Sequence, residues 1–167
     1  MTLDDFKPSS ETLFHNRAAD VDAVEEQLGV RLPEEYREFI TRFGEGTLAG
    51  YIRVYPPYQI LEGDNNVTAW RERIDEYWFW DAGKDVLTKA EALECVIVAD
   101  TMDGDELVAH PSEPDRLYVL PRYEEKIFVA GDGLLAAIEW LLTSGTLTDP
   151  IDDRTFDPFD GRRAGGG

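Results

Sequence analysis

The chain of 167 residues has the length of one domain, and with 43% hydrophobic residues it can bury a single core without disulfides or metals. Its charge is unusual, because 16 Lys and Arg face 35 Asp and Glu, which gives a formal net charge of −19. Such a chain repels phosphate backbones and anionic membrane surfaces, so we expect no binding to nucleic acid or to membranes. The acidity favours cationic partners, and a need for solubility explains it equally well.

No export signal and no disulfide framework is predicted. Cys95 is the only cysteine, and residues 1–10 lack the apolar run of a signal peptide. The longest apolar stretch, residues 133–142, is interrupted by Glu139 and is too short to cross a bilayer. We therefore expect a cytoplasmic protein.

The first third of the chain predicts two helices and then a strand region. Apolar residues recur at helical spacing over residues 20–28 and again over residues 36–43. The second helix has a clear start, because Pro33 suits the first helical position and two glutamates follow it at the positive end of the helix dipole. A strand is expected over residues 48–55, ended by two prolines, with residues 58–61 as its extension or as a separate strand.

The remainder of the chain is predicted to be rich in strands. A helix over residues 67–80 and one helical turn over residues 88–93 come first. Four strands follow, and the strong turn dipeptide Asp103-Gly104 separates the first two. These strands are expected over residues 95–100, 106–110, 117–120 and 126–130. A last, largely apolar helix over residues 134–142 should be buried against the sheet.

Catalytic groups are scarce. The histidines are His15 and His110, and the only thiol, Cys95, begins an apolar strand, where an inert buried thiol is the commoner case. The acidic run of residues 100–106 does not fit a calcium-binding loop, because Met102 takes its third position, where a ligand is needed. No nucleophile elbow, phosphate-binding loop or zinc spacing is present. We expect no enzymatic activity, no cofactor and no metal site.

Residues 21–46 resemble the N-terminal motif of the SUKH superfamily, the SMI/KNR-type proteins. That motif runs from a helix through Leu-Gly, an apolar residue, Leu-Pro, two polar residues and Tyr to an apolar helix that ends in Gly. Residues 96–100, the dipeptide Gly104-Asp105 and residues 126–142 are also similar to the family. The resemblance implies an α+β fold with a single, mainly antiparallel sheet flanked by helices.

The extent of the resemblance also suggests the domain organisation. We expect a SUKH-like domain over residues 19–145, preceded by an N-terminal extension over residues 1–18. A C-terminal tail over residues 146–167 is expected to be partly flexible, although Phe156 and Phe159 could pin part of it onto the domain.

The resemblance implies a function in binding another protein. Most bacterial members bind and neutralise the toxin domains of polymorphic toxins, many of them nucleases, and other members, notably fungal ones, regulate cell-wall synthesis signalling. The first hypothesis is therefore an immunity protein whose partner is a cognate toxin, with an acidic surface that plugs a cationic cleft. The alternative is a constitutive adaptor that binds a cellular protein. A hydrolase is the weakest hypothesis, because it needs a catalytic His or a metal site.

The candidate contact residues combine acids with aromatic anchors. Aromatic side chains beyond the needs of a core, surrounded by charge, are typical of a protein-binding surface, although coverage of both sheet faces would explain them equally. The residues expected to contact the partner are Glu45, Tyr51, Trp80, Asp100, Asp103, Asp105 and Glu106. The residues expected to specify the fold are Leu32, Pro33, Tyr36, Phe39 and Gly104.

Overall fold

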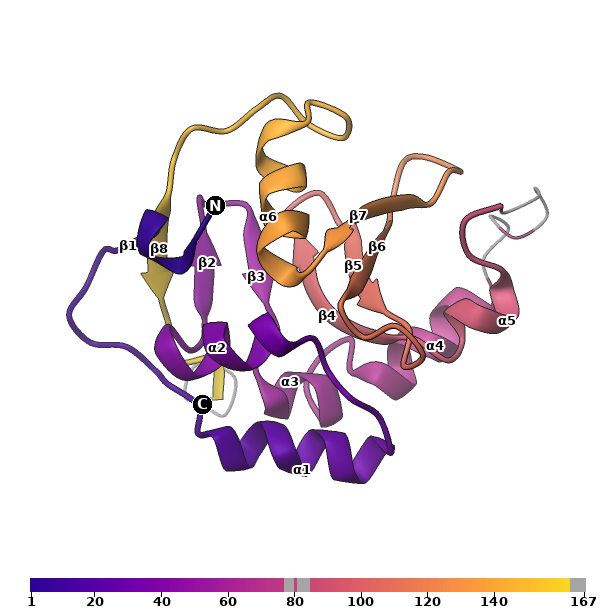
Figure 1. The fold of residues 1–167 in the computed structure, drawn as a ribbon, viewed down its shortest axis with the longest axis horizontal. Coiled ribbons are helices and arrows are strands. Elements are labelled where there is room, and N and C mark those ends of the chain that lie inside the picture. Colours follow the sequence, from indigo (N-terminus) through magenta and orange to yellow (C-terminus); the bar gives the residue numbers. More distant parts are fainter. Residues whose placement is uncertain (77–79, 81–84, 163–167) are drawn as a thin grey trace.

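The computed structural model describes residues 1–76, 80 and 85–162, in which helices surround one sheet (Figure 1). The helices are the 3-10 helix η1 (Leu3–Asp5) and the α-helices α1 (Ala18–Leu28), α2 (Glu34–Arg42), α3 (Pro57–Leu61), α4 (Val67–Asp75), α5 (Lys89–Ala92) and α6 (Leu134–Thr143). The strands are β1 (Lys7–Pro8), β2 (Gly46–Leu48), β3 (Ile52–Val54), β4 (Val96–Thr101), β5 (Glu106–Ala109), β6 (Arg116–Leu120), β7 (Phe128–Asp132) and β8 (Thr155–Pro158).

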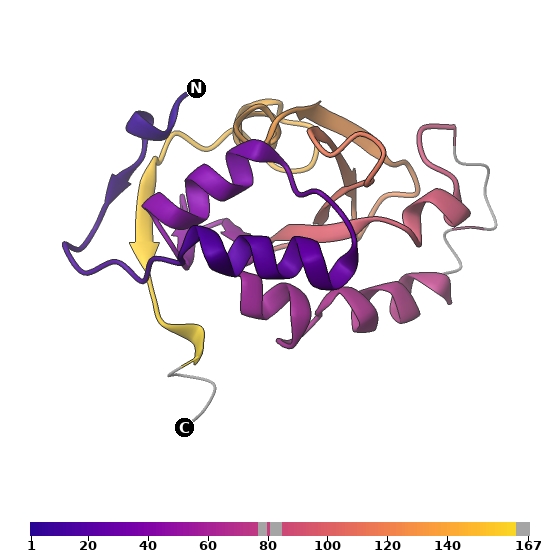
Figure 2. The same ribbon diagram turned by 60° about the horizontal axis from the view of Figure 1, so that its bottom comes forward.

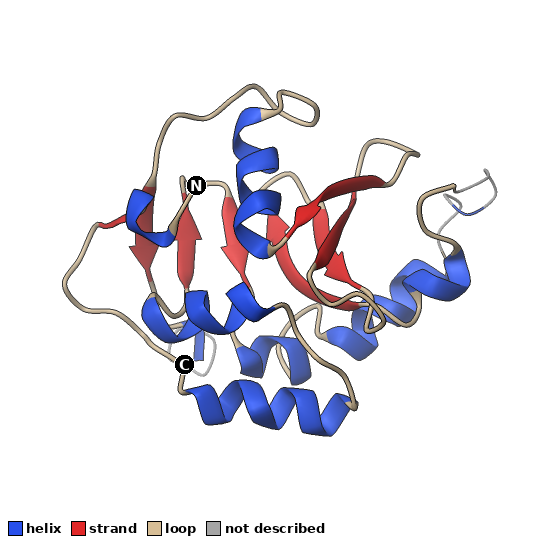
Figure 3. Ribbon diagram, viewed as in Figure 1, coloured by secondary structure: helices blue, strands red, loops and turns tan. Residues whose placement is uncertain are grey.

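The strands form a single eight-stranded sheet in the order β1-β8-β2-β3-β4-β5-β6-β7. Neighbours in this order are antiparallel, except that β1 and β8 are parallel. Figure 3 shows the sheet with helices around it. The predicted α+β class and the mainly antiparallel sheet flanked by helices are confirmed.

Helices cover both faces of the sheet (Figure 2). On one face α2 packs against α6, which contacts β6 and β7, while α3 and α4 contact β4 from the other face. Helix α1 lies beside α2 and α3. The helices predicted over residues 20–28, 36–43 and 134–142 are confirmed as α1, α2 and α6, because an apolar stripe at helical spacing has a core to pack against in each case.

The helices α2 and α6 are capped by side chains from distant parts of the chain. The Oδ1 atom of Asp115, in the β5–β6 loop, accepts a hydrogen bond from the Glu34 amide at 3.1 Å. The Oε1 atom of Glu35 in turn accepts one from the Leu135 amide of α6 at 3.1 Å. Neither helix has a capping side chain at its own N-cap position. Tertiary contacts therefore satisfy amides that local sequence leaves open.

The strand predicted over residues 48–55 is in fact a hairpin. Leu48, at the end of β2, pairs with Ile52, at the start of β3. Between them Ala49 and Gly50 both have positive φ, 56° and 61°, the left-handed conformation that so tight a turn requires. Hydrophobic periodicity does not reveal this turn, because apolar residues continue through it.

Residues 58–61, expected as strand, lie in α3, so that prediction is wrong. The second of two consecutive prolines occupies the first helical position, and the carbonyl of the first accepts hydrogen bonds from the amides of Gln59 and Ile60. The helix predicted over residues 67–80 is confirmed over α4 only. Residues 77–79 of that prediction lie outside the described part of the chain.

Both flanks of the predicted domain contribute strands to the sheet. Strand β8, from the predicted tail 146–167, lies between β2 and β1, and β1 comes from the predicted extension 1–18. Phe156 of β8 is fully buried. Its ring centroid lies 5.9 Å from that of Phe39 and 5.2 Å from that of Phe43, both in or next to α2. The C-terminal segment is thus part of the hydrophobic core up to β8.

We expect the substitution Phe156→Ala to lower the free energy of unfolding by about 3–5 kcal/mol, because it removes a fully buried ring from between α2 and the sheet. The matched control is Val129→Ala on the edge strand β7, where the side chain is partly exposed and the loss should be about 1 kcal/mol or less. Urea denaturation of both variants measures the difference. Equal losses would show that β8 contributes nothing to the core.

Candidate functional site

Three turns lie side by side at one end of the sheet, in the upper part of Figure 3, because β2 to β7 run alternately up and down. We call this end the hairpin edge and define it as residues 49–51, 102–105 and 121–127, which connect β2 to β3, β4 to β5, and β6 to β7. The hairpin predicted at Asp103-Gly104 is confirmed as the middle turn. The opposite end of the sheet carries the connections to the helices.

The carboxylate of Asp105 joins the three turns. Its Oδ2 atom accepts a hydrogen bond from Thr101 Oγ1 at 2.9 Å, and Oδ1 accepts one from the Arg122 amide at 3.1 Å. The Tyr51 hydroxyl lies 3.4 Å from Asp105 Oδ2 and 3.2 Å from Asp103 Oδ2, so its single proton is shared between the two carboxylates. Burial, with the carboxylates of Asp105 and Asp103 nearby, raises the pKa of Tyr51, which therefore keeps its proton and donates it. Asp105 and Tyr51 are 4% and 6% exposed. Both hold the turns together, and their contact with a partner stays a prediction.

Two apolar side chains project from the hairpin edge. Met102 is 72% exposed and Tyr123 is 81% exposed, the highest values among the large hydrophobic residues in the described part of the chain. The Arg122 guanidinium lies 5.6 Å from the Tyr123 ring centroid. Asp103 and Glu124 are also exposed in these turns. The edge thus presents apolar anchors among charged groups, an arrangement typical of protein-binding surfaces.

Glu106 lies behind the hairpin edge, on the sheet face that α4 covers, and is 5% exposed. Its Oε2 atom forms an ion pair with Arg73 of α4 and accepts a hydrogen bond from Asn65 Nδ2 at 2.8 Å. Burial raises the pKa of the Glu106 carboxyl, and Arg73 and Asn65 oppose this effect. The residue was expected at a binding surface, and the structure places it in the contact between α4 and the sheet.

Asp100 continues this buried polar network toward β3. Its Oδ2 atom accepts hydrogen bonds from the Tyr55 hydroxyl at 2.6 Å and from Arg53 Nη2 at 2.9 Å. The Tyr55 hydroxyl also accepts one from Asn65 Nδ2 at 3.1 Å, which links Asp100 to Glu106. The carboxylate of Asp100 is thus engaged within the domain.

Glu45 lies at the other end of β2, in a pocket of about 430 Å³ between α3 and the C-terminal segment. We call it the Glu45 pocket, lined among others by Glu45, Tyr58, Glu62, Asp64, Gly161 and Arg162. The Glu45 carboxylate accepts hydrogen bonds from the Tyr58 hydroxyl at 2.6 Å and from the Gly161 amide at 2.8 Å. The Arg162 guanidinium carbon lies 4.5 Å from the Tyr58 ring centroid.

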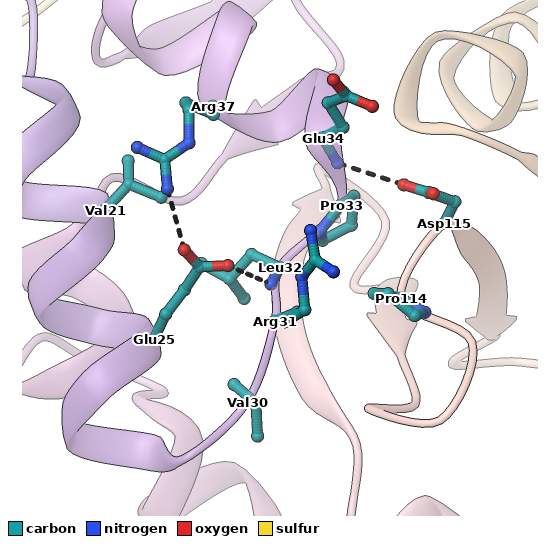
Figure 4. A pocket seen from close by; sticks show the side chains of 10 residues that line it. All are labelled: Val21, Glu25, Val30, Arg31, Leu32, Pro33, Glu34, Arg37, Pro114 and Asp115. Carbon is teal, nitrogen blue, oxygen red and sulfur yellow. Dashed lines mark hydrogen bonds and ion pairs between the residues drawn. The ribbon is translucent and has the colours of Figure 1, made fainter.

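A second pocket, of about 400 Å³, lies at the connection between α1 and α2 (Figure 4). Glu25 accepts a hydrogen bond from the Leu32 amide at 2.8 Å and forms an ion pair with Arg37 at 2.8 Å. The far wall is made by Pro114 and Asp115 of the β5–β6 loop. Both oxygens of Glu25 are therefore used to fix the α1–α2 connection, which agrees with a fold-specifying role for the Leu-Pro motif.

Trp80 lies apart from the other predicted contact residues. Its indole N–H donates a hydrogen bond to the Ile74 carbonyl at 2.5 Å, and its half-buried ring packs against the core. The structure thus groups Tyr51, Asp103 and Asp105 at the hairpin edge, Asp100 and Glu106 behind it, and leaves Glu45 and Trp80 elsewhere. Sequence reasoning did not single out Met102 and Tyr123, the two most exposed large hydrophobic residues of the described chain. Their positions in polar turns, where an apolar side chain has no core to enter, were the available signal.

Burial keeps the thiol that a hydrolase would need as a nucleophile in its protonated form. Burial raises the pKa of Cys95 to about 12, so the thiolate is scarce at neutral pH. His110 Nδ1 is 2.7 Å from Ser112 Oγ, and Nε2 is 3.4 Å from Glu94. Within the described residues no group of three His, Cys, Asp or Glu side chains is placed to hold a metal ion. The same residues include no helix with the length and apolar character needed to span a membrane.

The fold and its surfaces define a class of protein, a small α+β domain suited to binding another protein. The model of the SMI1 / KNR4 family (SUKH-1) matches residues 16–132, well over half of the chain. The chain therefore belongs to this family, which confirms the resemblance. Its members are in general non-enzymatic binding proteins whose partners are proteins. No curated protein matches the chain.

We expect the Glu106 carboxyl to make stability depend on pH. Its pKa in the folded protein lies above the ordinary value of 4.5, so just above pH 4.5 the folded state keeps a proton that the unfolded state has lost. The contribution to stability is therefore complete below 4.5 and is lost as the pH rises through the folded pKa.

The matched variant Glu106→Gln cannot titrate. Urea denaturation between about pH 5 and about pH 8 gives the free energy of unfolding of both proteins, and the wild-type value minus the variant value should fall with rising pH. A difference that stays constant, or that rises with pH, would contradict the direction assigned to this carboxyl.

Proposed function

We propose that this protein is a cytoplasmic immunity protein that binds and neutralises the toxin domain of a bacterial polymorphic toxin, one that is a nuclease. Family membership supports a protein partner. The observation that carries the proposal is the exposure of Met102 and Tyr123 on turns that the buried carboxylate of Asp105 holds together. Because these turns are fixed before binding, little conformational entropy is lost in the complex.

The net charge supports the choice of partner. A nuclease has a cationic cleft for phosphate, and a chain of net charge −19 is steered toward such a cleft. We assign direct contact to Asp103 and Glu124, which are exposed beside the two apolar anchors. Tyr51 and Asp105 support the turns. Asp100 and Glu106, each paired with an arginine behind the hairpin edge, support the strands that carry these turns. Trp80 stays a candidate anchor outside the hairpin edge.

The alternative, a constitutive adaptor for a cellular protein, has one observation in its favour. Asp105, Glu106 and Glu45 are buried and hydrogen-bonded within the domain. Part of the acidity therefore serves the fold and is not displayed to a partner.

Co-expression with the protein encoded next to this chain tests the proposal. We expect the pair to co-purify at about 0.15 M salt, and growth to be restored when the neighbour alone is toxic. Absence of a complex with a toxic neighbour would overturn the immunity function. A neighbour that binds without being toxic would favour the adaptor.

Within such a complex, Tyr123→Ala should weaken binding by at least about tenfold, because it removes an exposed aromatic anchor.

The double variant Asp103→Lys with Glu124→Lys should slow association and reduce its dependence on salt. Calorimetry and stopped-flow mixing measure the two effects. The matched control reverses the same number of charges away from the hairpin edge, at Glu26 of α1 and Glu72 of α4, which are both exposed. Equal effects from both charge variants would remove the hairpin edge as the contact surface.

A further inference from the structure

The Glu45 pocket contains a buried carboxylate without a cationic partner. Glu45 is 5% exposed, and no Lys or Arg of the described residues forms an ion pair with its carboxylate. Within the part of the chain that the structure describes, only the Tyr58 hydroxyl and the Gly161 amide donate to it. Buried carboxylates are usually paired, and one satisfied by hydrogen bonds alone leaves a negative potential in the space beside it.

The ring of Tyr58 forms the wall of this space. Its hydroxyl is fixed by the 2.6 Å hydrogen bond to Glu45, so the orientation of the ring is set. Burial and the Glu45 carboxylate raise the pKa of Tyr58, which keeps this proton in place. An aromatic face next to a carboxylate attracts a cation, and a planar guanidinium fits such a face better than an ammonium does.

The chain's own C-terminal segment shows which ligand the pocket accepts. Arg162 stacks over the Tyr58 ring at 4.5 Å, and the preceding Gly161 donates its amide to Glu45. A Cβ atom on residue 161 would collide with the Tyr58 hydroxyl and the Glu45 carboxylate, so the backbone approaches as closely as only glycine allows. The Gly161-Arg162 dipeptide of the same chain therefore occupies part of the pocket.

The pocket has the room and the charge to hold a guanidinium from another protein once Arg162 leaves. Its volume is about 430 Å³, and the exposed acids Glu62 and Asp64 line it. Arg53, a cation that also lines the pocket, is paired with Asp100 at 2.9 Å. Arg162 is itself exposed and can leave the ring without unpacking the core.

We infer that the Glu45 pocket is a binding site for an arginine side chain of the protein partner, which takes the place of Arg162 on the Tyr58 ring. The inference rests on the proposed function in one respect: it takes the partner that supplies the arginine to be a basic protein. It gives Glu45, one of the predicted contact residues, the role of holding Tyr58 and attracting the guanidinium. Arg162 acts as an internal competitor.

The test uses the full chain and N-acetyl-L-arginine amide as the probe. Isothermal titration calorimetry should show that Arg162→Ala binds the probe about fivefold more tightly than wild type, because the ring is vacated. The matched control is Arg116→Ala, which removes an arginine from another tyrosine ring, that of Tyr118, at 5.8 Å, and should bind the probe as wild type does. N-acetyl-L-citrulline amide, which has the same shape without the charge, should not bind.

Two second-site variants keep the test decisive. Arg162→Ala combined with Tyr58→Leu should lose the probe. Should that protein fail to unfold cooperatively, Arg162→Ala with Glu45→Gln, which keeps the shape of the side chain, should lose it as well. The inference is overturned when Arg162→Ala binds no more tightly than Arg116→Ala, or when it binds the arginine and citrulline compounds equally.

This outcome is independent of the toxin. Binding of the probe without any toxin complex would support the pocket and count against the proposed function. A toxin complex formed through the hairpin edge, with no probe binding to Arg162→Ala, would overturn the pocket alone.

Discussion

Three consecutive residues at the start of α2 position most of the molecule. The Glu34 amide is held by Asp115 of the β5–β6 loop, the Glu35 carboxylate caps α6, and the Tyr36 hydroxyl donates to the Tyr55 carbonyl beyond β3 at 2.5 Å. One helical turn thus ties together the β5–β6 loop, the helix on the same face and the strand that leads into α3. The Leu-Pro motif matters because it places this turn. Pro33 is the N-cap, with ψ 138°, and not the first helical residue that the sequence predicts, so α2 begins at Glu34.

A net charge of −19 opposes a compact fold, and the structure shows how the fold tolerates it. The acids that enter the interior each contact donors from another element. Asp105 is held by the turns, Glu106 by Arg73 of α4 and by Asn65 before it, and Glu45 by α3 and the C-terminal segment. Burial of a carboxylate costs free energy unless such donors meet it, and each of these acids has at least two. The buried acids therefore join elements that are distant in sequence, and the exposed acids provide the external field. Buried and exposed acids therefore have different roles, and the net charge alone does not distinguish them.

Local patterns in the sequence were enough to predict α1, α2, α6 and the β4–β5 hairpin, because periodicity and turn dipeptides report on neighbours a few residues away. They could not predict contacts made across the sheet. The sequence suggests only that Phe156 attaches part of the C-terminal tail to the domain. The long-range pairing of β8 with β1 and β2 shows that Phe156 is a core residue. The candidate site was affected in the same way. An acid next to a turn looks exposed in sequence, yet Asp105 and Glu106 point to donors contributed by other elements. Met102 and Tyr123 are the converse case, apolar residues without any element to cover them.

The separation of buried from exposed acids changes what the acidity implies about a partner. An evenly acidic surface would attract any cationic surface with little selectivity, because screened electrostatic attraction depends little on the shape of the partner. The described surface is more specific: two apolar side chains on fixed turns at one end of the sheet, and a carboxylate–tyrosine pocket already holding a guanidinium at another place. Each is a short-range feature that requires matching chemistry, an apolar recess for the first and an arginine for the second. Long-range charge can bring a basic protein to this domain, and selection among basic proteins then depends on these contacts, since only they distinguish one cationic surface from the next.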